Sequence, residues 1–209
     1  MILSVISQKG GSGKTTVALN LAGCVAAKKQ RVLLVDADEQ GSALSWLEMR
    51  EAEPAFSVVG MPTGSLHRDL PKIASDYDLT IIDCPPRLQK IARSAITAST
   101  GVLIPVGPSP LDIWAAEEIV NLIQELQEFQ PVKAAMMMNR KIVGTALSKE
   151  VQQGLRDFGL PVLKAGLSQR VAFAEAMISG QTVNEYQRGS KAAAEIEKFT
   201  KEVQRWLKS

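Results

Sequence analysis

The sequence has few of the residues that mark several large classes of protein. Among its 209 residues are two cysteines, one histidine and only 5% aromatic residues. Cys24 and Cys84 lie far apart, without the pair spacing of a metal site, and no cysteine or carboxylate cluster surrounds His67. We therefore assign both cysteines to the core and give the histidine no role.

Long hydrophobic runs are also missing. No window is apolar enough to span a bilayer, and the apolar run at residues 1–7 is too short for a signal sequence and has no basic leader. The composition, 45% apolar and 22% charged, excludes a disordered or fibrous protein. We expect a single domain over residues 1–209, located in the cytoplasm.

The net charge is small, at +2, but it is unevenly distributed. Residues 188–209 contain six Lys/Arg and three Asp/Glu. This tilt fits a surface that faces a polyanion, and it fits a solvated terminal helix equally well.

Strand and helix patterns alternate along the chain. β-branched runs with little period-two alternation indicate strands buried on both faces of a parallel sheet. The order predicts an α/β fold: a doubly wound, mostly parallel sheet flanked by helices. The predicted strands are residues 2–7, 31–36, 79–83, 102–106 and 132–138, and the predicted helices are 15–28, 110–129, 147–158, 169–179 and 190–207.

A glycine-rich turn lies between the first predicted strand and the first predicted helix. Glycines let backbone N–H groups turn inward around phosphate oxygens, and the helix N-terminus adds its positive dipole end. The turn therefore predicts a phosphate loop that binds ATP, in a variant form because Gln8 stands where the usual pattern has glycine. A dinucleotide-binding fingerprint is set aside, since no third glycine follows at the required offset. The loop residues are Lys9, Gly10, Gly11, Ser12, Gly13, Lys14, Thr15 and Thr16.

The polar residues of this loop have separate predicted roles. Lys14 contacts the β- and γ-phosphates, the Thr15 hydroxyl coordinates Mg²⁺, and Thr16 donates to the α-phosphate. Lys9 is a second lysine just before the glycine pair. It is either a surface lysine in a strand-to-loop turn or a second cation at the phosphate site, and the glycine-rich context favours the second interpretation.

Three aspartates stand where predicted strands end. We expect Asp83 to hold a magnesium-bound water. Asp36 and Asp38 are two residues apart, so in an extended chain they point to the same side; one would orient the attacking water and the other would join the magnesium shell. The alternative is that an aspartate after a strand caps the next helix or starts a turn.

These segments together resemble the deviant Walker A ATPases of the ParA/MinD superfamily, a branch of the P-loop NTPases. Residues 9–16, 35–41 and 81–86 agree with that family in order and spacing. A pattern between Ala174 and Ala193 is similar to the C-terminal region of ParA partition ATPases, so the resemblance covers nearly the whole chain. With no DNA-binding domain ahead of Met1, the chain resembles the short ParA type.

The resemblance implies an ATP-driven cycle. Lys9 would reach across a nucleotide-sandwich homodimer to the phosphates of the partner subunit, so that ATP favours the dimer and hydrolysis releases it. Asp36 and Asp38 would belong to a first switch segment and residues 83–88 to a second, and Asn139 would hydrogen-bond adenine. Glu39 departs from the family, which more often has proline there.

The resemblance also implies partners. A ParA-type dimer binds DNA without sequence preference, associates with the nucleoid and positions a plasmid, chromosome region or protein cargo, while a small ParB-like or adaptor protein stimulates hydrolysis. The basic residues that we consider for DNA are Arg140, Lys141, Lys164, Arg170, Arg188, Lys191, Lys198, Lys201, Arg205 and Lys208.

Other functions remain as alternatives. A MinD-like protein would insert its last helix into a membrane, through an apolar stripe that includes Ile196 and Phe199; the same spacing also fits a helix packed on the sheet. An electron-transfer iron protein would need a second cysteine beside Cys84 to hold its cluster, and the sequence has no suitable one. If Glu39 disables the switch, the chain would be a binding module without turnover.

Overall fold

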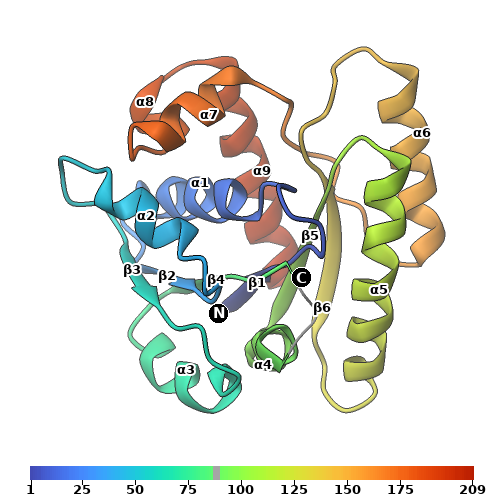
Figure 1. The fold of residues 1–209 in the computed structure, drawn as a ribbon, viewed down its shortest axis with the longest axis horizontal. Coiled ribbons are helices and arrows are strands. Elements are labelled where there is room, and N and C mark those ends of the chain that lie inside the picture. Colours follow the sequence, from blue (N-terminus) through green and yellow to red (C-terminus); the bar gives the residue numbers. More distant parts are fainter. Residues whose placement is uncertain (87–89) are drawn as a thin grey trace.

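The computed structural model describes residues 1–86 and 90–209, without the side chains of residues 146–149. Within them lies a parallel six-stranded sheet with the strand order β3-β2-β4-β1-β5-β6 (Figure 1). The α/β fold class predicted from the sequence is confirmed. The strands are β1 (Ile2–Val5), β2 (Val32–Asp36), β3 (Ser57–Gly60), β4 (Leu79–Asp83), β5 (Gly101–Val106) and β6 (Lys133–Met138).

The strands are buried on both faces because alternate residues enter different cores. Leu3 and Leu34 belong to one core, whereas Ile2 and Leu33 belong to the other. This explains why the strands show almost no period-two pattern of polarity. β3 differs: it lies at the sheet edge and its residues are mostly exposed.

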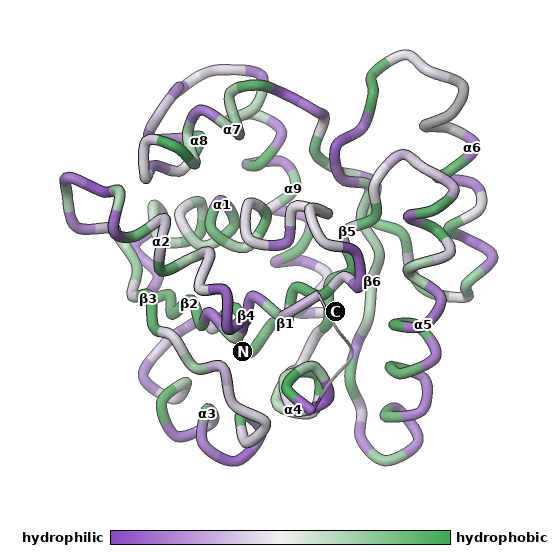
Figure 2. Tube along the Cα trace, in the orientation of Figure 1, coloured by the Kyte–Doolittle hydropathy of each residue, from purple (hydrophilic) through white to green (hydrophobic). Residues whose placement is uncertain are grey.

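Helices cover both faces of the sheet (Figure 1). The first core packs under α1 (Lys14–Ala26), α2 (Ser42–Glu48), α7 (Val171–Ile178), α8 (Val183–Tyr186) and α9 (Lys191–Lys208). The second packs under α3 (Leu66–Ala74), α4 (Lys90–Ala98), α5 (Pro110–Gln127), α6 (Ala146–Gly154) and the 3₁₀ turn η1 (Leu155–Phe158). Helix α5 alternates hydrophobic and hydrophilic residues, as expected for a helix packed on a sheet (Figure 2).

The sheet places the glycine-rich turn at its topological switch point. β1 lies between β4 and β5, so the chain leaves β1 toward one side of the sheet and later builds the other side. Ligands of open parallel sheets bind at this point, beyond the carboxyl ends of the strands. The turn after β1, the aspartates after β2 and β4 and Asn139 after β6 therefore share one edge.

The last helix is amphipathic, and its apolar side lies inside the protein. Ile196, Phe199 and Val203 are fully buried in the core that α9 shares with α1. Of the two interpretations of the apolar stripe, the structure thus favours packing on the sheet over a membrane-inserting surface. No helix of the described residues is long and apolar enough to cross a membrane.

Candidate functional site

The turn after β1 has the backbone of a phosphate-binding loop. Gly11 and Gly13 have positive φ angles of 72° and 84°, which side chains other than glycine rarely tolerate. A Cβ atom at Gly13 would also lie 2.6 Å from Nδ2 of Asn139. No side chain caps the N-terminus of α1, and its first turn contains no acidic residue, so its free N–H groups can serve an anion.

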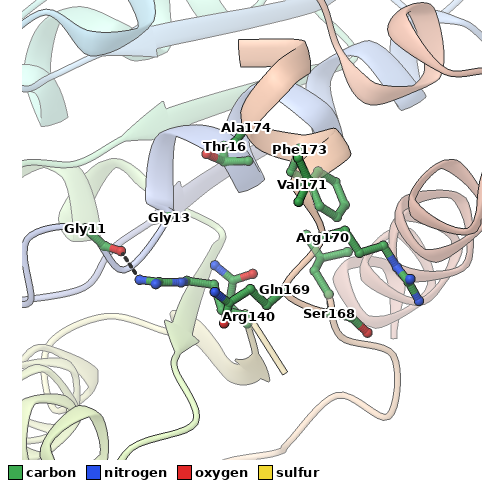
Figure 3. Close-up of a pocket in the computed structure, with 12 residues that line it drawn as sticks. Gly11, Gly13, Thr16, Arg140, Ser168, Gln169, Arg170, Val171, Phe173 and Ala174 are labelled. Carbon is green, nitrogen blue, oxygen red and sulfur yellow. Dashed lines mark hydrogen bonds between the residues drawn. The ribbon is translucent and has the colours of Figure 1, made fainter. Parts of the chain in front are cut away.

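Two consecutive residues after β6 hold this loop in place. Asn139 donates from Nδ2 to the carbonyl oxygen of Ser12 at 2.7 Å. Arg140 donates from Nη1 to the carbonyl oxygen of Gly11 at 2.9 Å (Figure 3). Arg140 reaches the loop from a left-handed backbone, with φ at 52°, a conformation that bulky residues adopt at a cost. The loop thus depends on a distant part of the chain for its shape.

Lys14 and Asp83 form the buried electrostatic centre of the site. Asp83 is 1% exposed, and its Oδ1 atom has no hydrogen-bond partner among the described residues. Burial raises the pKa of Asp83 to about 7, aided by Asp36 and Asp38 and opposed by the Thr15 hydroxyl and Lys14. Burial also lowers the pKa of Lys14, against the attraction of Asp83. A bound cation would favour the charged form of this carboxyl.

The centre fits a magnesium–nucleotide complex better than a metal alone. Among the described residues no three His, Cys, Asp or Glu side chains form a group that could hold a metal ion. The hydroxyl of Ser12 is buried without a partner, like the free oxygen of Asp83. Buried polar atoms without partners are rare, and phosphate and metal-bound oxygens would satisfy both.

The two aspartates after β2 have different environments. The carboxylate of Asp36 accepts N–H groups from Asp38 at 3.1 Å, Ala43 at 2.8 Å and Leu44 at 3.2 Å. Asp36 therefore caps α2, and this geometry favours the capping alternative over the catalytic role. Asp38 is only half-buried, and its Oδ1 accepts one N–H, from Gln40 at 3.1 Å. Asp38 remains the better candidate for contact with a ligand or a water.

Lys9 lies beside the loop and is paired within its own subunit. Its Nζ is 2.5 Å from Oδ1 of Asp112, in the first turn of α5, and its side chain is 44% exposed. A cavity of about 310 Å³ opens here, and Ser12, Arg140 and Ile142 help to line it. Lys9 thus lies beside the glycine-rich loop, and its contact with a phosphate stays a prediction.

A second cavity, of about 430 Å³, also borders the loop and shares Gly11, Arg140 and Gln169 with the first (Figure 3). Its size is within the usual range for small-molecule sites, roughly 300–1,000 Å³. The sequence did not reveal its far wall, because residues 167–174 carry no motif and approach the loop only through the fold. The lining residues are Gly11, Gly13, Thr16, Asn139 and Arg140 on one side and Leu167, Ser168, Gln169, Arg170, Val171, Phe173 and Ala174 on the other.

The two cysteines and the histidine of the sequence analysis take no direct part in the candidate site. Cys24 and Cys84 are buried, and burial raises the pKa of the Cys84 thiol to about 12. His67 pairs its Nδ1 with the Ser94 hydroxyl at 2.8 Å. Within the predicted second switch, residues 83–86 are described and residues 87 and 88 lie outside the described residues.

The parallel sheet and the glycine-rich loop before α1 are those of a P-loop nucleotide-binding protein, and a comparison with known families says which one. Residues 3–183 match the family model of the CobQ/CobB/MinD/ParA nucleotide binding domain, so the chain belongs to this family of P-loop ATPases, whose cofactors are ATP and Mg²⁺.

Two relatives illustrate the match in sequence. The chain is 32% identical over 206 residues to maintenance of carboxysome distribution protein A of Halothiobacillus neapolitanus, covering 96% of this chain and 95% of that protein. It is 30% identical over 243 residues to the chromosome-partitioning ATPase Soj of Thermus thermophilus, covering 96% and 94%.

Solved structures support the same fold. Apo McdA of Cyanthece has a TM-score of 0.81 at 18% identity, covering 99% of this chain and 98% of that one. The cell division ATPase MinD of Pyrococcus furiosus has a TM-score of 0.79 at 20% identity, covering 98% of both.

Proposed function

We propose that the protein is an ATPase of the ParA type, which dimerises on ATP, binds DNA without sequence preference and positions a cargo. The observation that carries this proposal is Lys9, a second lysine beside the glycine-rich loop, which is paired with Asp112 and lines the 310 Å³ cavity. Two relatives are named for carboxysome distribution and chromosome partitioning, which supports a positioning role. The cargo would be DNA or a protein assembly.

ATP would lie across the glycine-rich loop. Its adenosine half would occupy the 430 Å³ cavity, with Asn139 near the base, and its phosphates would meet Lys14, Thr16 and the N-terminus of α1. Thr15 and Asp83 would hold Mg²⁺, which neutralises charge that develops on the phosphates. Asp38 would orient the attacking water.

Dimerisation would follow from the position of Lys9. In the single subunit the ammonium group of Lys9 is neutralised by Asp112. In the proposed dimer it would leave this carboxylate for the γ-phosphate bound by the partner subunit, and it would gain a charge-assisted contact only when that subunit holds ATP. Hydrolysis removes the γ-phosphate and would return Lys9 to Asp112.

The DNA-binding surface is proposed on the outer face of α9. Its exposed basic residues recur at helical spacing. Two of the basic residues considered from the sequence are engaged elsewhere: Arg140 holds the loop, and Arg170 pairs with Glu195. The α9 row consists of Lys191, Lys198, Lys201, Arg205 and Lys208.

The proposal is tested by ATP-dependent retention on DNA of arbitrary sequence. We expect retention with MgATP and little with MgADP, and we expect it to weaken steeply with salt because phosphate contacts release counterions. A double variant, Lys198→Glu with Lys201→Glu, should lose DNA retention while keeping its affinity for nucleotide. The matched control is Lys72→Glu, a charge reversal on α3, which packs under the other core.

Two results would contradict the proposal. Equal retention on DNA with MgATP and with MgADP would mean that the nucleotide does not control DNA binding. Sedimentation with anionic liposomes, without binding to DNA, would indicate a MinD-like membrane function. Phosphate release, measured with DNA and a small protein encoded next to this chain, tests the proposed hydrolysis and its stimulating adaptor.

A further inference from the structure

Part of the far wall of the 430 Å³ cavity comes from the start of α7, and the rest is not a regular element of the fold. Residues 163–170 run from the sheet edge to α7, and four of the residues that line the cavity come from this segment or its junction with the helix: Leu167, Ser168, Gln169 and Arg170. A wall of this kind is shaped by whatever holds its backbone.

One side of this segment is held by the sheet. Leu163 and Leu167 donate their N–H groups to the carbonyl oxygens of Met136 and Met138, at 2.8 Å and 3.0 Å. Gln169 donates to the carbonyl oxygen of Lys141 at 2.9 Å. The segment thus runs alongside β6 and pairs with it in places, without forming a strand of its own.

The other side is held by two carboxylates of α9. Glu202 accepts the N–H groups of Lys164 at 2.8 Å and Ala165 at 2.6 Å. Glu195 accepts the N–H and the hydroxyl of Ser168, at 3.0 Å and 2.9 Å. The two acids are seven positions apart, which is about two helical turns, so they lie on one side of the helix.

Glu195 also binds Arg170, the last residue of this segment before α7. Arg170 donates from Nη2 to Oε1 of Glu195 at 2.6 Å, and both side chains are partly buried. Burial opposes the charge of Glu195, but Arg170 and Ser168 outweigh this effect and lower its pKa. Glu195 itself is absent from the cavity lining, so it acts on the cavity only through these partners.

We propose that Glu195 and Glu202 are positioning residues, which fix the wall that recognises the nucleoside half of the nucleotide and take no part in holding its phosphates. This inference rests on the proposed function, because it assigns the cavity to adenosine. Its physical reason is that the carboxylates constrain residues 164–170, whereas Asn139 and Arg140 constrain the phosphate loop.

The test compares a nucleotide with a ligand that has phosphates but no nucleoside. Affinities for MgADP and for magnesium tripolyphosphate are measured by calorimetry on the whole protein, for the wild type, Glu195→Gln and Glu197→Gln. Glu197 is an exposed acid on the same helix and is the matched control. Unfolding in urea is measured for all three.

For Glu195→Gln we expect MgADP affinity to fall about tenfold, because a neutral amide loses the charge-assisted bonds that hold Arg170 and Ser168. Its tripolyphosphate affinity should stay within about twofold of wild type, and Glu197→Gln should match wild type for both ligands. If Glu195→Gln folds poorly, Glu202→Gln tests the same inference. It should lower MgADP affinity by a smaller factor, about threefold.

Unchanged MgADP affinity in both variants would overturn the inference. An equal loss of MgADP and tripolyphosphate affinity would also overturn it, because the carboxylates would then act on the whole site. A wild-type protein that bound tripolyphosphate but not MgADP would instead overturn the proposed function, and this inference with it.

Discussion

The two sides of the candidate nucleotide site are built in different ways. The phosphate side is one contiguous turn, in which Gly11 and Gly13 supply the backbone angles and Lys14 the charge. The nucleoside side is assembled from residues 167–174, which depend on β6 and on α9 for their position. The residues of the proposed phosphate side are thus neighbours in the sequence, although Asn139 and Arg140 brace them from a distance, whereas the proposed nucleoside side is brought together only by the tertiary structure.

The largest effect should come from removing the charge on the phosphate side. Lys14→Ala is expected to lower the affinity for MgADP and for magnesium tripolyphosphate together, by roughly a hundredfold or more, because a buried cation at a phosphate site makes charge-assisted bonds. Calorimetry checks this, with Lys72→Ala as the control on α3. If Lys14→Ala bound tripolyphosphate normally, the loop assignment would be wrong.

Filling the cavity on the nucleoside side should weaken the binding of MgADP but not that of magnesium tripolyphosphate. Ala174 is exposed and lines the cavity, so Ala174→Trp would fill the cavity without disturbing the core. We expect MgADP affinity to fall about tenfold or more while tripolyphosphate affinity is kept. Glu175→Trp, the next residue and outside the cavity lining, is the matched control. Equal MgADP affinity in the two variants would place the nucleoside elsewhere.

Replacing Asp36 and replacing Asp38 should affect different properties of the protein. Asp36→Ala should lower the free energy of unfolding by about 1–2 kcal/mol, because the N-terminus of α2 loses its cap. Asp38→Ala should leave stability nearly unchanged but lower the ATP hydrolysis rate by roughly a hundredfold with MgADP binding kept. Urea unfolding and phosphate release measure the two effects. Full turnover in Asp38→Ala would remove Asp38 from the mechanism.

The last prediction is a pH dependence of the free energy of unfolding, which arises from Asp83. Its pKa is raised to about 7 in the folded protein, so between the unfolded and folded values the folded state binds more protons. The free energy of unfolding of the ligand-free protein should therefore decrease as pH rises from about 4 to about 7. In Asp83→Asn this decrease should be smaller, as urea unfolding at several pH values would show. An identical slope in both proteins would mean that Asp83 does not titrate in this range.

The sequence predicted correctly those elements whose conformation is determined by residues that are adjacent in the chain. The strand at residues 79–83 is confirmed with its predicted ends, and the last helix is confirmed within one residue at each end. The turn at residues 9–16 was recognised because glycine spacing determines backbone angles directly.

Other features depend on contacts that the sequence does not display. β3 is a short, exposed edge strand, and α3 contains Pro71 inside a helix, so neither had a clear pattern. Asp36 looked like a ligand for the site because its motif lies there, but its Oδ2 accepts two N–H groups of α2 and its Oδ1 accepts the N–H of Asp38. Glu195 was counted only as part of a charged terminal helix, and its partners lie 25 to 27 residues away in the chain.

The central claim is that a cation of one subunit senses the γ-phosphate bound by the other, and the mass of the protein in solution tests it most directly. Light scattering during gel filtration should show a dimer for the wild type with a nonhydrolysable ATP analogue and a monomer with MgADP. Lys9→Ala should remain a monomer with both ligands and keep MgADP affinity within about twofold of wild type. A Lys9→Ala protein that dimerised on the analogue as the wild type does would contradict the account.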